Sequence, residues 1–535
     1  MLLSGLMACL LEAQSIEVLP AFPQAEGWGA YAKGGRGGKV IFVENLNDDG
    51  PGSLRGAVQD PDPRIVLFRV SGTIELKSDL RIRHPYITIA GQTAPGDGIC
   101  LKNFPLKITQ THDVIVRELR VRPGIEWLPE GKSSDAIAVE HSRNVIIDHC
   151  SASWSTDEII NTNNLNANIT IQWCLFAESL NDSVQQREHG YAATLGGVRS
   201  SFHHNLLAHN KGRNPSIGGG DRNRRSELDI RNNVVYNWVS RVCDGKPHAV
   251  NFVANYYRPG PATPTRRRAV VAEIQSSEKY GFYSQWYIAD NHIEGFPALT
   301  ADNWNGAVRF RAGCSMEKNR ARTPFENTGF NTRDAKQAYL EVLNHVGVTT
   351  PKRDLVDRRI IDDVRRGRAS IGNGIIDSVD QVGGWPELST GDIPVDTDND
   401  GMPDHWEIRE GLDIRDPSDR AEVSEGRVYD NLDRYLNELA SNQPYLLPPV
   451  GLEAHLENDR TLVLTWTDIS DGERGFVIQR ADIHGNYSTL DTVGPGVTRF
   501  TCISDTSSSE ASYRVYAFDD KRMSIVSKTA NIESR

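Results

Sequence analysis

The segment "IRNN", residues 230–233, places an asparagine at the end of a short hydrophobic strand. The same pattern recurs in "FHHN" (202–205), "FVAN" (252–255) and "IADN" (288–291). Further copies read "VREL" (116–119), "IDHC" (147–150) and "IQWC" (171–174), and successive copies lie about 22 to 36 residues apart. A repeat of that length predicts a solenoid in which each copy forms one coil.

Each copy begins with alternating apolar residues, such as Val145 and Ile147, which is the period of a half-buried strand. Stacked coils place like residues above like residues, so we expect an amide ladder of four asparagines inside one turn: Asn205, Asn233, Asn255 and Asn291. The sequence therefore predicts an all-β protein built on a right-handed parallel β-helix. A β-sandwich also contains many short strands, but it does not predict an asparagine at a constant phase.

Cys150 and Cys174 fall in the same column of the repeat, on adjacent coils and within reach of a disulfide. Two stacked buried thiols are favoured over a disulfide, and the pairing stays open at this point. The chain has seven cysteines, which give neither a disulfide framework nor a CxxC metal spacing.

Composition excludes several partner classes for this chain of 535 residues. A net charge of -12 argues against nucleic acid and membrane surfaces as general partners, because both carry negative charge. The apolar segment in "MLLSGLMACLLEAQS" predicts a signal or lipoprotein segment over residues 1–14. We therefore expect an exported protein, secreted or at the cell surface or periplasm, with no transmembrane segment and in monomeric form.

Three further regions follow from composition. Residues 15–390 are assigned to the β-helix, 391–443 to a calcium-binding loop and helix linker, and 444–535 to a small β-sandwich. The last region resembles a fibronectin type III domain through "LVLTWTD", "RGFVIQRA" and "YRVYAFD", and we expect it to act as a spacer. The charged run from Lys352 to Arg368 is expected to be a solvated tail that wraps the solenoid.

A calcium loop is predicted in "DTDNDGMPDHWE". Its oxygen-bearing residues and its glycine fall at positions 1, 3, 5, 6, 9 and 12 of such a loop: Asp396, Asp398, Asp400, Gly401, Asp404 and Glu407. The loop resembles the calcium repeats found between domains of exported bacterial proteins, and a structural ion that stiffens the linker is expected. A solvated acidic turn is the alternative.

A second calcium site is predicted on the solenoid itself. Asp135 precedes one predicted strand, and Asp157 and Asn161 belong to the next coil, where residues four apart project to the same side. Arg213 follows two coils later in "KGRNPSIGGGDRNRR" (211–225), a concentration of positive charge in an acidic protein. These residues describe an oxygen-lined calcium site on one face of the β-helix, and acids in turns or facing solvent are the alternative.

Several motifs in order resemble the pectate lyases of polysaccharide lyase family 1 over residues 20–390. They are "FPQAEGWGAYAKGGRGG", "GPGSLR", "ITIAGQTAPGDGI", "DAIAVEHSRNVIIDHCSASWSTDE", "SFHHNLLAHNKGRNP" and "IRNNVVYNW". The resemblance implies a right-handed parallel β-helix that cleaves α-1,4-linked galacturonan (pectate or low-methylated pectin). It further implies calcium-dependent β-elimination, which gives 4,5-unsaturated oligogalacturonides.

The resemblance also implies roles for single residues. Asp135, Asp157 and Asn161 match the positions that hold the catalytic calcium, and Arg213 matches the arginine that acts as the base. Asp148 and His149 match a scaffold pair of the family.

The chain departs from the family pattern at three places. Ser133 and Asn161 stand where acids are common, which weakens binding of a hard cation. Gly218 stands where many members have a second arginine, and "HGYAATLGG" contains no lysine. The missing substrate-binding cations are assigned to three other basic residues of the segment: Lys211, Arg222 and Arg224.

Two other functions are left open by the sequence. A β-helix can be a polysaccharide hydrolase with paired carboxylates, but Asp157 and Glu158 are adjacent and diverge on an extended strand. A non-catalytic pectin-binding β-helix is the other alternative, with the departures at Asn161 and Gly218 marking a lost site.

Overall fold

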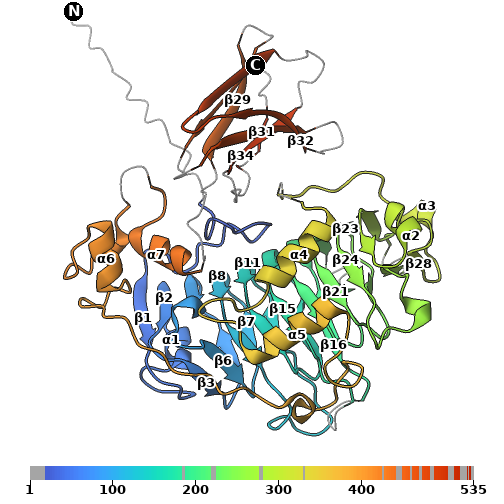
Figure 1. Cartoon of the computed structure of the whole chain (residues 1–535), viewed down its shortest axis with the longest axis horizontal. Helices are drawn as coiled ribbons and strands as arrows, with labels where there is room; N and C mark the ends of the chain where they lie inside the picture. The colour runs from blue at the N-terminus through green and yellow to red at the C-terminus, as the bar shows by residue number, and fades with distance from the viewer. Residues whose placement is uncertain are drawn as a thin grey trace, which may run out of the picture.

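A computed structural model describes residues 19–182, 187–218, 225–275, 281–328, 330, 332–423, 427–440, 449–457, 461–468, 473–481, 487–503, 511–518, 527 and 529–531. Three long parallel sheets wind into a solenoid, and a small pair of antiparallel sheets follows at the C-terminal end of the chain (Figure 1). The predicted right-handed parallel β-helix and the small β-sandwich are confirmed. The predicted export segment, residues 1–14, lies outside the described residues.

The first sheet, sheet A, has ten parallel strands, and each coil of the solenoid adds one of them. Consecutive coils stack in register, so that Ile171 pairs with Phe202, which pairs with Ile230. Its strands in spatial order are β1 (Lys39–Val43), β2 (Arg64–Phe68), β5 (Ile87–Ala90), β8 (His112–Arg117), β11 (Arg143–Asp148), β14 (Ala167–Gln172), β17 (Gly197–His203), β20 (Ser226–Arg231), β23 (Ala249–Val253) and β26 (Gln285–Ala289).

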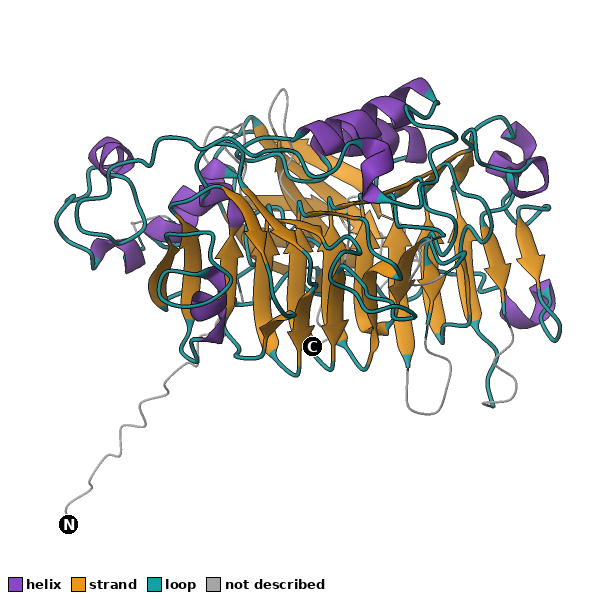
Figure 2. Ribbon diagram, turned by 90° about the horizontal axis from the view of Figure 1, so that it is seen from below, coloured by secondary structure: helices purple, strands orange, loops and turns teal. Residues whose placement is uncertain are grey.

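The other two sheets, B and C, have nine strands each, and the side-by-side strands are visible in Figure 2. Sheet B contains β3 (Gly72–Glu75), β6 (Ile99–Lys102), β9 (Arg120–Arg122), β12 (Ser151–Ser153), β15 (Leu175–Ala177), β18 (Leu206–Ala208), β21 (Val234–Tyr236), β24 (Tyr256–Arg258) and β27 (His292–Ile293). Sheet C contains β4 (Leu80–Ile82), β7 (Leu106–Thr109), β10 (Ile137–Glu140), β13 (Glu158–Asn164), β16 (Tyr191–Leu195), β19 (Ser216–Ile217), β22 (Asp244–Gly245), β25 (Ala272–Ile274) and β28 (Val308–Phe310).

The predicted asparagine ladder runs through the turn between sheets A and B. The backbone N and the Nδ2 of Asn205 both lie 3.0 Å from Oδ1 of Asn233, and Asn233 bonds to Asn255 in the same way. Asn255 continues to Asn291, which in turn bonds to Asn303. The residue before each ladder asparagine takes a left-handed backbone conformation: His204, Asn232, Ala254 and Asp290. The ladder therefore satisfies the backbone groups that this tight turn leaves unpaired.

The two cysteines of the same column are free, buried thiols. The backbone N of Cys150 lies 3.4 Å from Sγ of Cys174, whose own backbone N donates to Oδ1 of Asn205 at 2.8 Å. The thiols thus extend the ladder, and the stacked arrangement favoured from the sequence is the one observed.

Helices cover two faces of the solenoid. α4 (Ala335–His345) and α5 (Leu355–Arg366) lie over sheet B (Figure 1), where Val342 and Ile360 pack with Leu206 and Val234. The expectation of a solvated tail from Lys352 to Arg368 is wrong, because α5 is amphipathic and buries one face. The other helices are α1 (Leu54–Gln59), η1 (Gly91–Thr93), η2 (Thr265–Arg267), α2 (Pro297–Ala301), α3 (Met316–Asn319), η4 (Val379–Val382), α6 (Asp404–Glu410), η5 (Asp419–Ala421) and α7 (Asn431–Leu439).

The sandwich near the C-terminus consists of two antiparallel sheets with their own core, which includes Trp466, Phe476 and Tyr513. One sheet holds β29 (Val450–Glu457), β30 (Thr461–Thr467) and β33 (Arg499–Ile503). The other holds β32 (Tyr487–Val493), β31 (Gly475–Ala481), β34 (Ser512–Phe518) and β35 (Ala530–Asn531). Among the residues that the structure describes, no helix is both long and apolar enough to cross a bilayer.

The ladder gives a direct test of the fold. Asn233→Ala removes an acceptor for two donors of Asn205 and a donor to the Phe202 carbonyl, all of them buried. Unsatisfied buried groups are costly, so urea unfolding should show a loss of about 2 kcal/mol or more. The control Asn305→Ala changes an exposed asparagine and should stay within about 0.5 kcal/mol of the parent. Equal midpoints for the two variants would contradict the role of the ladder.

Candidate active site

The predicted site residues converge on four neighbouring strands of sheet C. Asp135 precedes β10, Asp157 precedes β13 and Arg213 precedes β19, and β16 lies between the last two. Because parallel strands in register begin at the same edge of a sheet, residues that are distant in sequence meet there. The register confirms the alignment, since Glu158 pairs with Tyr191 and Tyr191 bridges to Gly212.

Three carboxylates form the centre of the site. Each of Asp135, Asp157 and Glu158 places an oxygen within 4.8 Å of the others. Ser133 Oγ donates to Asp157 Oδ2 at 3.0 Å, and His189 Nε2 lies 2.9 Å from Asp157 Oδ1. Burial, followed by repulsion from Asp157, raises the pKa of Asp135 to about 7. The site therefore concentrates negative charge that a cation would stabilise.

Glu158 was not among the predicted ligands, and the sequence argument that it diverges from Asp157 is wrong. The two residues lie at the start of β13, where the chain enters the strand, and their carboxylate oxygens approach one another. Strand alternation holds inside a strand, but it does not fix the side chains at its first residues. Glu158 is buried and accepts a hydrogen bond from Thr194 Oγ1 at 2.6 Å.

Asn161, a predicted calcium ligand, lies beside the carboxylates. Its Nδ2 donates to Asp135 Oδ2 at 3.2 Å, and its Oδ1 accepts from the backbone N of Asn163 at 3.0 Å. In this orientation Asn161 stabilises the Asp135 carboxylate, while its oxygen is used within its own strand.

The segment around Arg213 is built into the solenoid as part of a coil. The Arg213 carbonyl accepts from the backbone N of Ala193 at 2.9 Å, and the backbone N of Asn214 donates to the Val242 carbonyl at 2.6 Å. Arg213 itself takes a left-handed conformation with φ of 54°. The backbone is thus held from both sides, which fixes the direction of the arginine side chain.

The Arg213 guanidinium lies between an acid and an aromatic ring. It forms an ion pair with Glu158, and its Cζ lies 4.0 Å from the ring centroid of Tyr191. Burial, followed by the charge of Arg241, lowers the pKa of Arg213, while Asp157, Asp244 and Asp135 oppose the shift.

Arg241 is a site residue that the sequence reasoning missed. Its Cζ lies 5.3 Å from the Tyr191 ring centroid, and its Nη1 lies 3.0 Å from Asp244 Oδ2. It belongs to "SRVCDG", a stretch without a repeat motif. Its position next to Arg213 follows from the pairing of β19 with β22, in which Ser216 pairs with Asp244.

The predicted substrate-binding cations have different outcomes. Lys211 is directed to Glu188, with Nζ 3.2 Å from the carboxylate and 3.0 Å from the backbone carbonyl. Arg222 and Arg224 lie outside the described residues. At Gly218 an added Cβ would lie 1.9 Å from Oδ1 of Asn163, which explains why no arginine side chain stands there.

Asp148 and His149 lie at the end of β11 in sheet A, in a hydrogen-bond network apart from the carboxylates on sheet C. Asp148 is fully buried and accepts from Arg117 Nε at 2.9 Å and Gln172 Nε2 at 2.8 Å, while His149 Nδ1 lies 2.8 Å away. These contacts hold the Asp148 pKa below its usual range despite burial. Every acceptor direction points into the scaffold, in agreement with the structural role expected for the pair.

The predicted calcium loop forms a second acidic centre. Carboxylate oxygens of Asp396, Asp398 and Asp400 lie within 4.8 Å of one another, and so do those of Asp400, Glu407 and Asp419. Burial and neighbouring acids raise the pKa of Asp400 to about 7 and that of Glu407 to about 8.

Two members of this centre differ from the loop pattern. Asp404 is turned toward Thr397, from which it accepts two hydrogen bonds at 2.7 Å, and it is absent from both groups of carboxylates within the described chain. Asp419 joins the centre from η5, twelve residues after Glu407, where the loop motif gives no signal.

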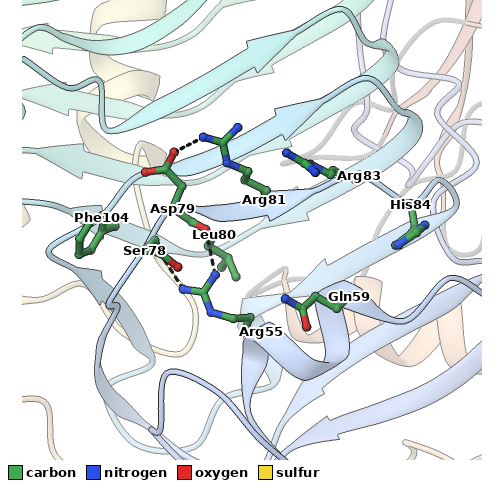
Figure 3. Close-up of a pocket in the computed structure, with 9 residues that line it drawn as sticks. All are labelled: Arg55, Gln59, Ser78, Asp79, Leu80, Arg81, Arg83, His84 and Phe104. Atoms are coloured by element: carbon green, nitrogen blue, oxygen red, sulfur yellow. Dashed lines mark hydrogen bonds and ion pairs between the residues drawn. The ribbon is translucent and has the colours of Figure 1, made fainter.

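A cavity of about 520 Å³ lies elsewhere, against α1 and β4. Figure 3 shows its basic lining, in which Arg55 donates to the carbonyls of Ser78 and Asp79, and Arg81 pairs with the Asp79 carboxylate. Neither Asp135 nor Arg213 lines this cavity. The carboxylates and arginines on sheet C are therefore the better candidate for chemistry.

Comparison with known proteins gives the family. "Probable pectate lyase C" from Aspergillus flavus is 35% identical over 420 residues, which cover 76% of this chain and 92% of that protein. The protein of the same name from Emericella nidulans is 35% identical over 441 residues, covering 82% and 97%. These relatives span most of the chain and define its enzyme class. The chain belongs to the pectate lyase family.

Solved structures are more distant. Jun a 1, the major allergen from cedar pollen, matches with a TM-score of 0.46 and 19% identity, covering 61% of this chain and 93% of that one. A Bacillus subtilis pectate lyase matches with a TM-score of 0.40 and 13% identity, covering 61% and 96%. No protein-family model matches the chain.

Proposed function

We propose that this protein cleaves α-1,4-linked galacturonan by calcium-dependent β-elimination and releases 4,5-unsaturated oligogalacturonides. One observation carries the proposal: Arg213, whose pKa is lowered, lies in contact with an acidic cluster that contains Asp135 and Asp157. A base next to a cluster of hard oxygen ligands suits a substrate whose reacting carbon bears a carboxylate.

The reaction removes a proton from C5 of a uronate, next to its carboxylate. In this scheme Arg213 takes the C5 proton, the released electron pair forms the C4–C5 double bond, and the bond from C4 to the leaving oxygen breaks. The leaving oxygen then takes up a proton. Only the neutral guanidine can act as a base, and burial together with Arg241 shifts Arg213 toward that form.

The acidic cluster fits calcium through its donor chemistry. Asp135, Asp157 and Glu158 offer hard oxygens at short mutual distance, and burial, followed by the charge of Asp157, raises the pKa of Asp135. A bound calcium ion supplies charge neutralisation for the substrate carboxylate. Asn161 and Ser133 orient Asp135 and Asp157 by hydrogen bonds.

Arg241 supplies the second substrate-binding cation in this proposal. It shares the Tyr191 ring with Arg213 and is 29% exposed, so that it can reach the carboxylate of a neighbouring uronate. A guanidinium matches a carboxylate in two parallel hydrogen bonds. Lys211, tied to Glu188, lies at the margin of the site and has the lesser part in binding.

We further propose the architecture predicted from the sequence. Residues 1–14 direct export, residues 15–390 form the catalytic β-helix, and residues 444–535 form a fibronectin type III-like spacer. The protein acts as a secreted or surface-located monomer. The separate core of the sandwich supports its assignment as a domain of its own.

Substitution of Arg213 tests the base directly. Arg213→Lys and Arg213→Ala should each lower the formation of unsaturated uronides by about 10³-fold or more, because lysine keeps the charge but not the position or pKa of the base. The ultraviolet absorbance of the new double bond measures the rate, and circular dichroism checks the fold. Turnover at the parental rate in either variant would contradict the assignment of Arg213 as the base.

Removal of calcium tests the acidic cluster. EDTA should abolish the absorbance gain on polygalacturonate, calcium should restore it, and Asp157→Asn should raise the calcium concentration that is needed. New reducing ends without absorbance, formed in EDTA, would instead support a hydrolase. Binding of polygalacturonate with no cleavage under any calcium concentration would support the non-catalytic alternative.

Arg241→Ala tests substrate binding. Loss of a charged hydrogen-bond partner should raise KM for polygalacturonate about tenfold or more, and Arg241→Lys should recover part of the loss. The control Arg225→Ala removes an exposed arginine that pairs with Glu227 and should leave KM unchanged. An unchanged KM for Arg241→Ala would contradict the role given to this residue.

A further inference from the structure

The described parts of the segment from 396 to 440, residues 396–423 and 427–440, pack onto the outer face of sheet A instead of hanging free between domains. Figure 1 shows α6 and α7 beside β1 and β2. One apolar cluster joins the segment to the first coils: Ile65, Leu67 and Ala90 from the β-helix with Met402, Trp406, Leu432 and Leu436. Gly401, with φ of 104°, fits so closely that an added Cβ would lie 2.6 Å from Leu67.

Polar contacts fasten the same segment at several further points, four of which follow. Arg117 Nη1 donates to Asn437 Oδ1 at 3.2 Å, and Gln92 Nε2 donates to the Leu436 carbonyl at 3.3 Å. The remaining two contacts join the segment to the region before β1: an ion pair between Arg36 and Asp433, and a hydrogen bond from Arg420 to the Gly38 carbonyl. The segment therefore contacts both the region before β1 and the first strands of sheet A.

Several buried carboxylate oxygens in this segment have no hydrogen-bond partner. Glu407 is fully buried and neither of its oxygens has a hydrogen-bond partner. Asp400 and Asp419 are 2% and 6% exposed, and one oxygen of each is likewise unpaired. Burying unpaired charge costs several kcal/mol per ion, and a cation between these oxygens would offset that cost.

The positions of the side chains indicate which residues would bind the cation. Asp396 and Asp398 reach the centre from the loop, Glu407 from α6 and Asp419 from η5, with Asp400 common to both groups of carboxylates. Arg69 Nη2, 3.0 Å from Asp396 Oδ2, compensates one of the five charges. Asn431, at the start of α7, donates to the Asp419 carbonyl at 2.9 Å and so links the centre to that helix.

We propose that one calcium ion is bound by Asp396, Asp398, Asp400, Glu407 and Asp419 and that this ion clamps the 396–440 segment onto the first coils of the β-helix. Five carboxylates, with Glu407 able to offer both oxygens, match the six to eight oxygen ligands that calcium takes. Asp404 is not a ligand. The ion is a structural element of the catalytic domain, independent of the site on sheet C.

Calcium titration distinguishes this ligand set from the loop pattern. The full-length chain carrying Asp135→Asn and Asp157→Asn is used, so that calorimetry reports the clamp alone. Adding Asp419→Asn should weaken calcium binding at least about tenfold, because a direct ligand loses its charge. Adding Asp404→Asn instead should keep the affinity, since an asparagine oxygen can still accept from Thr397. The reverse order of affinities, or equal affinities for the two variants, overturns the proposed ligand set.

Hydrogen exchange of the unmodified full-length protein tests the clamp itself and does not depend on any variant. Amides in peptides that cover β1 and β2 should exchange at least about tenfold more slowly with calcium than with EDTA, because the packed segment shields them. Peptides that cover β17 and β20, far from the clamp along the sheet, serve as the control and should change less. Equal exchange at β1 and β2 in the two conditions overturns the clamp. Neither readout involves catalysis, so a failure of the proposed lyase reaction would leave both results unaffected.

Discussion

Hydrogen bonds between stacked asparagines, from Asn205 to Asn303, fix the phase of successive coils in the second half of the solenoid. Each ladder residue satisfies the next one through its side-chain oxygen, so that a coil cannot slip without leaving buried donors unpaired. The constant phase carries over to sheet C, where the site is assembled. Asp135 and Arg213 are 78 residues apart in sequence but lie at the same edge of sheet C, before β10 and β19. The geometry of the site is therefore a consequence of the ladder.

At that site the protein environment disfavours both a negative and a positive charge. Burial and like charge raise the pKa of Asp135 and lower that of Arg213, so the acid and the base both lean toward their neutral forms. A bound cation would stabilise the ionised form of Asp135, and an anionic sugar would stabilise the protonated form of Arg213. In the proposed reaction, a bound cation would also act as a like charge on Arg213 and would favour the neutral guanidine that can take up a proton. At the second acidic centre, where Arg69 pairs with Asp396, the proposed role is structural instead.

Sequence periodicity was sufficient for the solenoid, because the asparagine column and the alternating apolar residues are local signals. It also placed Asp135 and Asp157 on adjacent coils and Arg213 two coils later. It could not find Arg241 or Asp419, since neither follows a motif and each is brought in by contacts across coils or helices. Charge was misleading in α5, where Asp357 is buried in an ion pair with Arg122, a partner 235 residues away. Spacing was likewise misleading for Asp404, because a loop position does not specify which way its side chain turns.

The most direct test of the catalytic account is a crystal structure of the Arg213→Ala variant with calcium and an oligogalacturonate. The account predicts an ion between Asp135 and Asp157 that also contacts a uronate carboxylate, with C5 of that sugar facing residue 213. A second uronate carboxylate should lie within hydrogen-bond distance of Arg241. An oligosaccharide bound in the cavity next to Arg55, or a sugar on sheet C with no ion at Asp135 and Asp157, would contradict it.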